Sequence, residues 1–290
     1  MRGTGPDHAG SGAVLRFGAD HGRAGVEMEA TPTTALITGA SSGIGHELAK
    51  RFARDRARLL LVGRNPDALG AVARELASLG ATGTEVIVAD LAKAAGAPQV
   101  LQELGARRLE VDALVNNAGY GLSGRFASTD LASELEMIQL NIGSLTALTK
   151  GVLPAMLARR RGTILNVAST AAFQPGPFMA VYYATKAYVL SFSEALAEEL
   201  SGTGVRVTTL CPGPTDTGFA ARANVTGSRL FHIGGRTSAA AVAAAGYRAM
   251  KQGRRLVIPG ALNQLQVQAV RISPRAAVLK IARALNETPG

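Results

Sequence analysis

Short apolar runs alternate with longer helix-like stretches along most of this chain. The runs are TALIT, RLLLVG, TEVIVA, DALVNN, TILNVA, VRVTTL and RRLVIP, and their apolar and β-branched residues are typical of strands buried on both faces. Between them, stretches such as 43–55, 65–80 and 130–160 have the spacing of helices. This alternation predicts an α/β fold with a parallel sheet covered by helices on both faces. Right-handed crossovers favour a Rossmann-type doubly wound sheet of about seven strands.

The ends of the chain differ from this regular centre. Residues 1–30 mix Gly, Arg, His and Asp without the apolar region of a secretory signal, so we expect a disordered extension. Residues 31–260 show no break in composition and predict one domain. Residues 261–290 predict two short amphipathic helices around Ser273-Pro274, with Arg271, Arg275, Lys280 and Arg283 among apolar residues. This tail either packs on the domain or a partner subunit, or lies at a membrane surface.

Charge and cysteine content restrict the function classes. The net charge is +10, but the short arginine groups are not interleaved with aromatic residues, so no nucleic acid partner is expected. The single cysteine, Cys211, excludes an internal disulfide and is typical of a reducing, cytoplasmic compartment, with peripheral membrane contact through the tail as an alternative. The histidines His46 and His232 have no metal-ligand spacing, so we expect no metal.

A glycine-rich turn follows the first predicted strand. In ALITGASSGIGHELAK, residues 35–50, Gly39, Gly43 and Gly45 can bring the backbone close to a phosphate, and the helix that follows offers free N–H groups. The spacing is T-G-x-x-x-G-I-G, which differs from both the G-x-G-x-x-G and the triphosphatase patterns. The context of a strand, a turn and a helix predicts a nucleotide-binding loop.

With this loop, several motifs make the chain resemble the short-chain dehydrogenase/reductase family, in its compact single-domain branch. They are the glycine turn, Asp90 in VADL, the NNAG motif at 116–119 and the CPGPTDT segment at 211–217, in which Thr215 departs from the usual Val or Ile. The resemblance covers residues 38 to about 259 and implies that residues 31–260 are an NAD(P)-binding catalytic domain. The cofactor-binding residues that it implies are Thr38, Gly39, Ser41, Ser42, Gly43, Ile44, Gly45, Arg64, Asp90, Asn117, Ala118, Gly119, Tyr182, Lys186, Pro212, Gly213, Thr215 and Thr217.

The end of the second strand bears on the choice of cofactor. An acidic residue there would bind the ribose hydroxyls of NAD, but this chain has Gly63-Arg64-Asn65. A guanidinium binds phosphate well, and in the family such an arginine accompanies NADP. The family's other NADP marker, a basic residue before the second loop glycine, is replaced by Ser42. NADP(H) is therefore favoured over NAD(H).

Two adjacent tyrosines compete for the role of catalytic acid. On a helix, Tyr182 and Tyr183 lie four and three residues before Lys186, so both are its neighbours and spacing alone does not decide. The family motif Y-x-x-x-K implies Tyr182, and leaves Tyr183 to packing or to the substrate pocket. The resemblance also implies Ser169 as the group that holds the carbonyl oxygen, and Asn141 as the residue that positions a proton-relay water. Lys186 and the nearby oxidised nicotinamide ring should together stabilise the Tyr182 phenolate and lower its pKa.

These residues predict an oxidoreductase that interconverts a carbonyl compound and a secondary alcohol. Segments 118–126, 170–181 and 217–235 should border the pocket and supply the apolar residues Tyr120, Phe173, Phe178, Met179, Phe219, Leu230 and Phe231. They favour a lipophilic substrate such as a 3-oxoacyl, steroid-like or aryl ketone compound. By resemblance we expect a homodimer or homotetramer formed through the helices near 130–158 and 181–201. The alternative is a regulatory protein that binds NADP(H) without turnover.

Overall fold

The computed structural model describes residues 33–219, 223 and 237–287. The predicted N-terminal extension, residues 1–30, lies outside these residues, and the first strand begins at Thr34. Leu230 and Phe231 also lie outside them.

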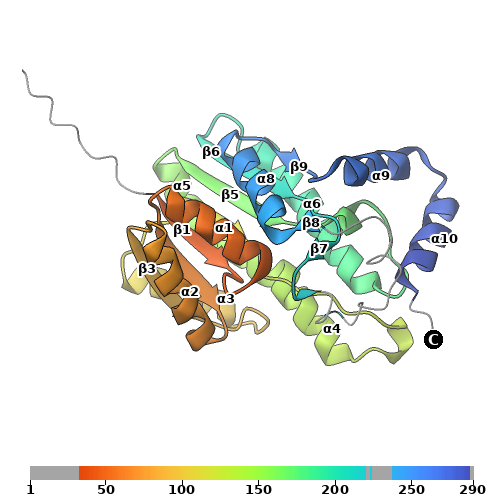
Figure 1. The fold of residues 1–290 in the computed structure, drawn as a ribbon, viewed down its shortest axis with the longest axis horizontal. Coiled ribbons are helices and arrows are strands. Elements are labelled where there is room, and N and C mark those ends of the chain that lie inside the picture. Colours follow the sequence, from red (N-terminus) through yellow and green to blue (C-terminus); the bar gives the residue numbers. More distant parts are fainter. Residues whose placement is uncertain (1–32, 220–222, 224–236, 288–290) are drawn as a thin grey trace, which may run out of the picture. The chain divides into compact units, whose positions relative to one another are not determined.

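Seven parallel strands form the predicted sheet, in the order β3-β2-β1-β4-β5-β6-β9 (Figure 1). The strands are β1 (Thr34–Thr38), β2 (Arg58–Gly63), β3 (Gly83–Val88), β4 (Ala113–Asn116), β5 (Gly162–Val167), β6 (Val205–Leu210) and β9 (Leu256–Val257). A separate pair, β7 (Thr215–Asp216) and β8 (Thr237–Ser238), was not predicted. The doubly wound α/β fold is confirmed.

Helices connect the strands and extend beyond the last of them. They are α1 (Gly43–Arg54), α2 (Pro66–Ser78), α3 (Gly96–Ala106), α4 (Leu131–Ile138), α5 (Leu145–Ala158), α6 (Ala180–Glu199), α8 (Ala239–Lys251), α9 (Ala261–Ile272) and α10 (Arg275–Asn286). Two 3₁₀ turns span Phe126–Ser128 and Thr170–Phe173. None of the helices in the described part of the chain is long and apolar enough to span a membrane.

The stretch predicted as one helix over 130–160 is interrupted. A π-helical segment, Gln139–Ser144, joins α4 to α5 and contains the buried Asn141. Wide turns of this kind re-aim the side chains that follow them and are frequent at functional sites. The interruption therefore sets the direction in which Asn141 points.

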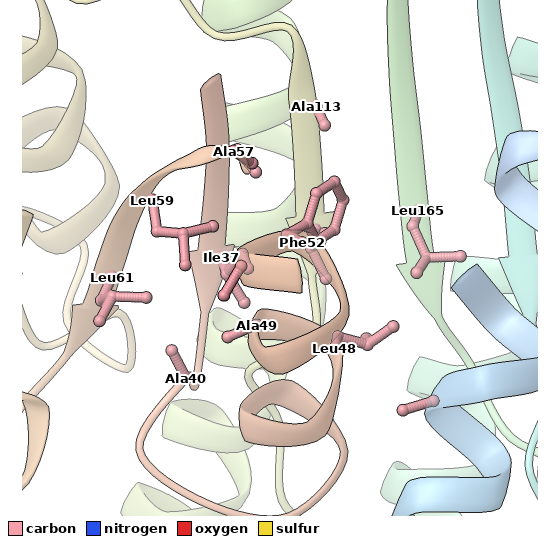
Figure 2. Packing of buried hydrophobic residues seen from close by; sticks show 14 of the residues in the cluster. Ile37, Ala40, Leu48, Ala49, Phe52, Ala57, Leu59, Leu61, Ala113 and Leu165 are labelled. Carbon is pink, nitrogen blue, oxygen red and sulfur yellow. The ribbon is translucent and has the colours of Figure 1, made fainter. Parts of the chain in front are cut away.

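Alternating strand residues build two cores, one on each face of the sheet. Ile37 of β1 belongs to the cluster that α1, α2 and α8 cover, while Leu36 belongs to the cluster that α3, α5 and α6 cover. Figure 2 shows Phe52 of α1 beside Ile37 of β1, and Leu48 of α1 on the side toward Leu165 of β5. Because both faces of the strands are buried, consecutive residues along each strand are apolar.

The connections leave the sheet in opposite directions on either side of β1. β1 pairs with β2 on one side and with β4 on the other, and the strand order reverses there. In doubly wound sheets the crevice at such a reversal, outside the carboxyl ends of the strands, is where ligands bind. The fold therefore places the glycine turn and the NNAG motif, which follow β1 and β4, in adjacent positions.

Candidate active site

A cavity of about 720 Å³ opens at the carboxyl ends of the strands. Its walls come from the loops after β1, β2, β3, β4, β5 and β6, from α6 and from the C-terminal helices. The predicted site residues that line it are Gly39, Ser41, Ser42, Gly43, Ile44, Arg64, Asp90, Asn117, Ala118, Gly119, Ser169, Tyr182, Lys186, Pro212, Gly213, Thr215 and Thr217. Thr38, Gly45 and Asn141 are absent from this lining and lie behind it.

The glycine turn takes a shape that side chains would prevent. Gly39 and Gly43 have φ values of +64° and +59°, a region that favours glycine. A Cβ on Gly45 would lie 2.4 Å from both the Gly39 carbonyl oxygen and Asn117 Nδ2. α1 then begins at Gly43 with no side-chain cap from Ser42 and no acidic residue in its first turn. Its first N–H groups and the positive end of its dipole fit a phosphate.

Thr38 and Asn117 tie this turn to the NNAG segment. Thr38 Oγ1 donates to the Val115 carbonyl at 3.2 Å and accepts from the N–H groups of Asn117 and Ala118, each at 3.0 Å. Asn117 Nδ2 donates in return to the carbonyls of Thr38 at 3.0 Å and Gly39 at 3.2 Å. Thr38 therefore shapes the phosphate loop from behind rather than from the cavity wall.

The outer part of the cavity carries Arg64 and Asp90. Arg64 is exposed directly after β2, and no carboxylate of the described residues is within ion-pairing distance of it. Asn65, beside it, caps α2 by accepting from the Ala68 N–H at 3.0 Å. Asp90 Oδ1 accepts from the Ala92 N–H at 3.0 Å, which fixes the turn after β3. The Arg64 guanidinium is thus available to an anionic ligand.

Tyr182 and Ser169 meet at the inner wall. Tyr182 lies in the first turn of α6, and Ser169, directly after β5, caps the following 3₁₀ turn by accepting from the Ala171 N–H at 3.1 Å. Burial raises the pKa of Tyr182 above its usual value, and a hydrogen bond with Ser169 opposes this only in part. The expected lowering of the Tyr182 pKa involves Lys186 and the oxidised nicotinamide ring together, so it stays a prediction for the cofactor complex. The phenol keeps its proton at neutral pH, which is the form that a proton donor requires.

Lys186 lies one helical turn after Tyr182. Its Nζ donates to the Val167 carbonyl at 2.9 Å and lies 5.9 Å from the centre of the Tyr182 ring. Burial lowers the pKa of Lys186 to about 8. The two side chains thus share one face of α6 and one buried pocket.

Asn141 braces the site from the π-helical segment. Its Nδ2 donates to the Tyr120 carbonyl and to Thr185 Oγ1, both at 3.0 Å, and its Oδ1 accepts from the Tyr120 N–H at 3.2 Å. A Cβ on Gly119 would lie 2.9 Å from Asn141 Oδ1 and 3.5 Å from Lys186 Nζ. Asn141 therefore lies close to Lys186, although it is outside the cavity wall.

Sequence reasoning missed part of the wall. The tail contributes Leu262, Asn263, Gln266, Ile281 and Leu285 to the cavity lining. Of the predicted apolar lining, Tyr120, Met179 and Phe219 are present, whereas Phe173 packs in a core cluster beside Cys211 and Phe178 lies outside the cavity. The position of the tail in the chain could have predicted this, because the tail follows the last strand and so starts at the same carboxyl edge as the other site loops.

The buried Lys186 predicts a pH-dependent stability difference. Its pKa in the folded protein, about 8, is below the usual 10.5, so the unfolded chain binds more protons between these values. The stability contribution of Lys186 therefore rises as the pH increases through this range. From about pH 7 to about pH 10, we expect the unfolding free energy of wild type to gain about 1–3 kcal/mol relative to Lys186→Met. Urea denaturation of both proteins across this range measures it, and a pH-independent difference would contradict it.

Known proteins share this sequence and architecture. A family model described as short chain dehydrogenase matches residues 33–226. The ketoacyl reductase HetN of a Nostoc species is 30% identical over 251 residues, which cover 84% of this chain and 86% of the relative.

Two solved structures superpose on most of the chain. A short-chain dehydrogenase from Sphingobium yanoikuyae in complex with NADPH has a TM-score of 0.73 and 31% identity, covering 84% of this chain and 97% of its own. A bulky-bulky ketone specific alcohol dehydrogenase from Comamonas testosteroni has a TM-score of 0.71 and 29% identity, covering 83% and 93%. This chain is therefore a member of the short chain dehydrogenase family and an oxidoreductase of carbonyl and CH–OH groups.

Proposed function

We propose that this protein is an NADP(H)-dependent oxidoreductase that interconverts an apolar carbonyl compound and its secondary alcohol. The observation that carries the proposal is one cavity whose wall contains both a phosphate-type glycine turn and the buried group Ser169, Tyr182 and Lys186. A proton donor, an oxygen-binding hydroxyl and a nucleotide loop are what such a reaction needs together.

The cavity residues fit a dinucleotide. The glycine turn and the first turn of α1 would hold the pyrophosphate, Asp90 the adenine, and Ala118 and Gly119 the middle of the cofactor. The segment with Pro212, Gly213, Thr215 and Thr217 would border the nicotinamide end. Bound NADPH would supply the hydride, while the protein orients the reactants.

The chain's own side chains would manage the proton and the carbonyl oxygen. Tyr182, protonated through burial, would donate its proton to the oxygen as negative charge develops there. Ser169 would donate a second hydrogen bond to the same oxygen. Lys186 would stabilise the resulting phenolate and contact the cofactor ribose. Asn141 would position the water of a proton relay through which Tyr182 regains its proton.

Apolar residues support a lipophilic substrate. Tyr120, Met179 and Phe219 line the cavity beside the catalytic group, and Leu262, Ile281 and Leu285 of the tail add to them. The ketoacyl reductase and the bulky ketone dehydrogenase similar to this chain are named for carbonyl substrates of this kind. We therefore favour 3-oxoacyl, steroid-like and aryl ketone compounds.

The two tyrosines provide a matched pair of variants. Tyr182→Phe should lower kcat by about 100- to 10,000-fold because it removes the proton donor. Tyr183→Phe removes a hydroxyl from the adjacent residue and should retain kcat. The measurement is NADPH absorbance with a panel of 3-oxoacyl thioesters, steroids and aryl ketones, with NADH as the cofactor control.

The possible outcomes separate the candidate functions. A fully active Tyr182→Phe would refute the assigned acid. NADPH binding without reduction of any compound in the panel would favour the alternative, a regulatory protein that binds NADP(H) without turnover.

Arg64 should decide between the two nicotinamide cofactors. Arg64→Gln removes the guanidinium that would bind the 2′-phosphate, so we expect NADPH affinity to fall by about 10- to 100-fold and NADH affinity to change little. Arg74→Gln, which removes an exposed arginine of α2 outside the cavity lining, is the control. Calorimetric titration with each nucleotide measures both effects, and equal losses for NADPH and NADH would contradict the assignment.

Exposed apolar residues on α4 support assembly into a homodimer or homotetramer. Leu131 and Leu135 are exposed, and Ile138 is partly so, on the helix that precedes the π-helical segment. Apolar side chains in such a group typically mark an interface.

The tail offers a second surface, for which we propose peripheral contact with anionic lipid. Leu265 and Ile272 of α9 are exposed, and Arg271 and Arg275 lie beside the turn between the helices. For the oligomer, light scattering should give the mass of a dimer or tetramer. For the lipid contact, the protein should be found in the pellet with anionic vesicles after sedimentation. A monomer in the first measurement, or an unbound protein in the second, would refute the corresponding proposal.

A further inference from the structure

We propose that α9 and α10 form a cap that completes the substrate pocket, and that Asn286 latches this cap to the catalytic helix through Tyr183. The proposal rests on the proposed function, because it assigns the cap to the apolar part of the carbonyl substrate. It identifies Asn286 as a positioning residue that determines specificity without touching the substrate.

The first helix of the cap is fixed against the nicotinamide end of the cavity. Asn263 Nδ2 donates to the Pro259 carbonyl at 2.7 Å. A Cβ on Gly213 would lie 2.4 Å from Asn263 Oδ1, so the first turn of α9 lies directly against the segment that follows β6. Val267, one turn farther on, is 2% exposed. α9 therefore has a defined position at the edge of the cavity.

The second helix is held at its end by a buried amide. Asn286, which is 1% exposed, accepts through Oδ1 from the Tyr183 hydroxyl at 3.1 Å. Its Nδ2 donates to the Pro177 carbonyl at 3.0 Å. One side chain thus joins α10 both to α6 and to the loop before α6. Breaking the two hydrogen bonds of this buried amide is costly, because each partner would be left unpaired.

Tyr183 is shaped to serve as the other half of this latch. A Cβ on Gly176 would lie 2.3 Å from Tyr183 Cδ2, so the ring packs directly on that glycine. Its neighbour Tyr182 packs edge-on against it, with ring centres 6.0 Å apart. The latch is therefore adjacent to the proton donor on the same helix.

A further contact supports the end of α10. The Phe178 ring has the Arg283 guanidinium 5.6 Å from its centre and the Arg125 guanidinium 5.8 Å from it. Phe178 has a φ of +65°, a strained conformation for an aromatic residue that the surrounding contacts must maintain. The loop before α6 is thus shaped to receive the cap.

Two apolar residues of the cap line the cavity without being covered by protein. Leu262 and Ile281 line the cavity, yet they remain 59% and 61% exposed. Core residues would be covered by protein, whereas these side chains leave apolar surface facing the open cavity. Covering roughly 50 Å² of such surface is enough for about a tenfold gain in affinity. The cap thus fits a substrate whose apolar chain extends beyond the carbonyl.

The test uses full-length Asn286→Ala with methyl ketones whose alkyl chains lengthen from ethyl to decyl. We expect kcat/KM of wild type to rise with chain length, and Asn286→Ala to lose about tenfold for the longest ketone through KM, with little loss for the shortest. Glu287→Ala, which truncates the exposed neighbour of Asn286, is the matched control and should behave as wild type. Equal losses at all chain lengths, or no loss, would overturn the proposal.

Hydrogen exchange provides a second readout that does not depend on turnover. Amides of α10 should exchange about tenfold faster in Asn286→Ala than in Glu287→Ala, while those of β1 and α1 stay protected. Tyr183→Phe, which removes only the hydroxyl of the latch, should show the same effect to a smaller extent. Unchanged exchange in both variants would refute the latch, whereas a wild type that reduces no ketone would refute the proposed function alone.

Discussion

All strands of the main sheet run in one direction, and the rest of the structure depends on that constraint. A parallel sheet needs a helical connection after each strand and a cover on both faces, which α1, α2 and α8 provide on one side and α3, α5 and α6 on the other. It also brings every strand's carboxyl end to the same edge. Groups as distant in the sequence as Gly39, Ser169 and Gly213 therefore line one cavity.

Hydrogen bonds at this edge convert a general architecture into a specific site. Thr38 and Asn117 exchange bonds that close the glycine turn against the end of β4, the neighbour of β1 in the sheet, leaving the start of α1 open to a phosphate. Asn141, Tyr120 and Thr185 do the same on the other side of the cavity. In both places side-chain hydrogen bonds to the backbone fix the loop that a ligand would meet.

The sequence was sufficient to predict the features that repeat. Apolar runs such as RLLLVG and TILNVA predicted the strands, and the motifs predicted the residues at the strand ends, because both follow from local pattern and strand order. The parts that escaped prediction depend on long-range packing. Neither the π-helical interruption at Asn141 nor the contact between Tyr183 and Asn286 has a periodicity of its own. The burial that raises the pKa of Tyr182 in the protein alone was not predictable either, since it depends on how deeply the fold buries that hydroxyl.

The bond between Tyr183 and Asn286 joins residues 103 positions apart, and this separation has a consequence for the order of folding. Contacts between distant segments form at a larger entropic cost than local ones, so they tend to form late and to open early. The nucleotide loop between β1 and α1 is closed by bonds to Asn117 and Ala118, up to 80 positions away, whereas the far wall of the pocket needs the end of α10. During folding, a chain can thus have a finished phosphate loop while its substrate compartment is still open to water. The same asymmetry makes fraying at α10 a way to change which compounds are accepted without disturbing the nucleotide loop.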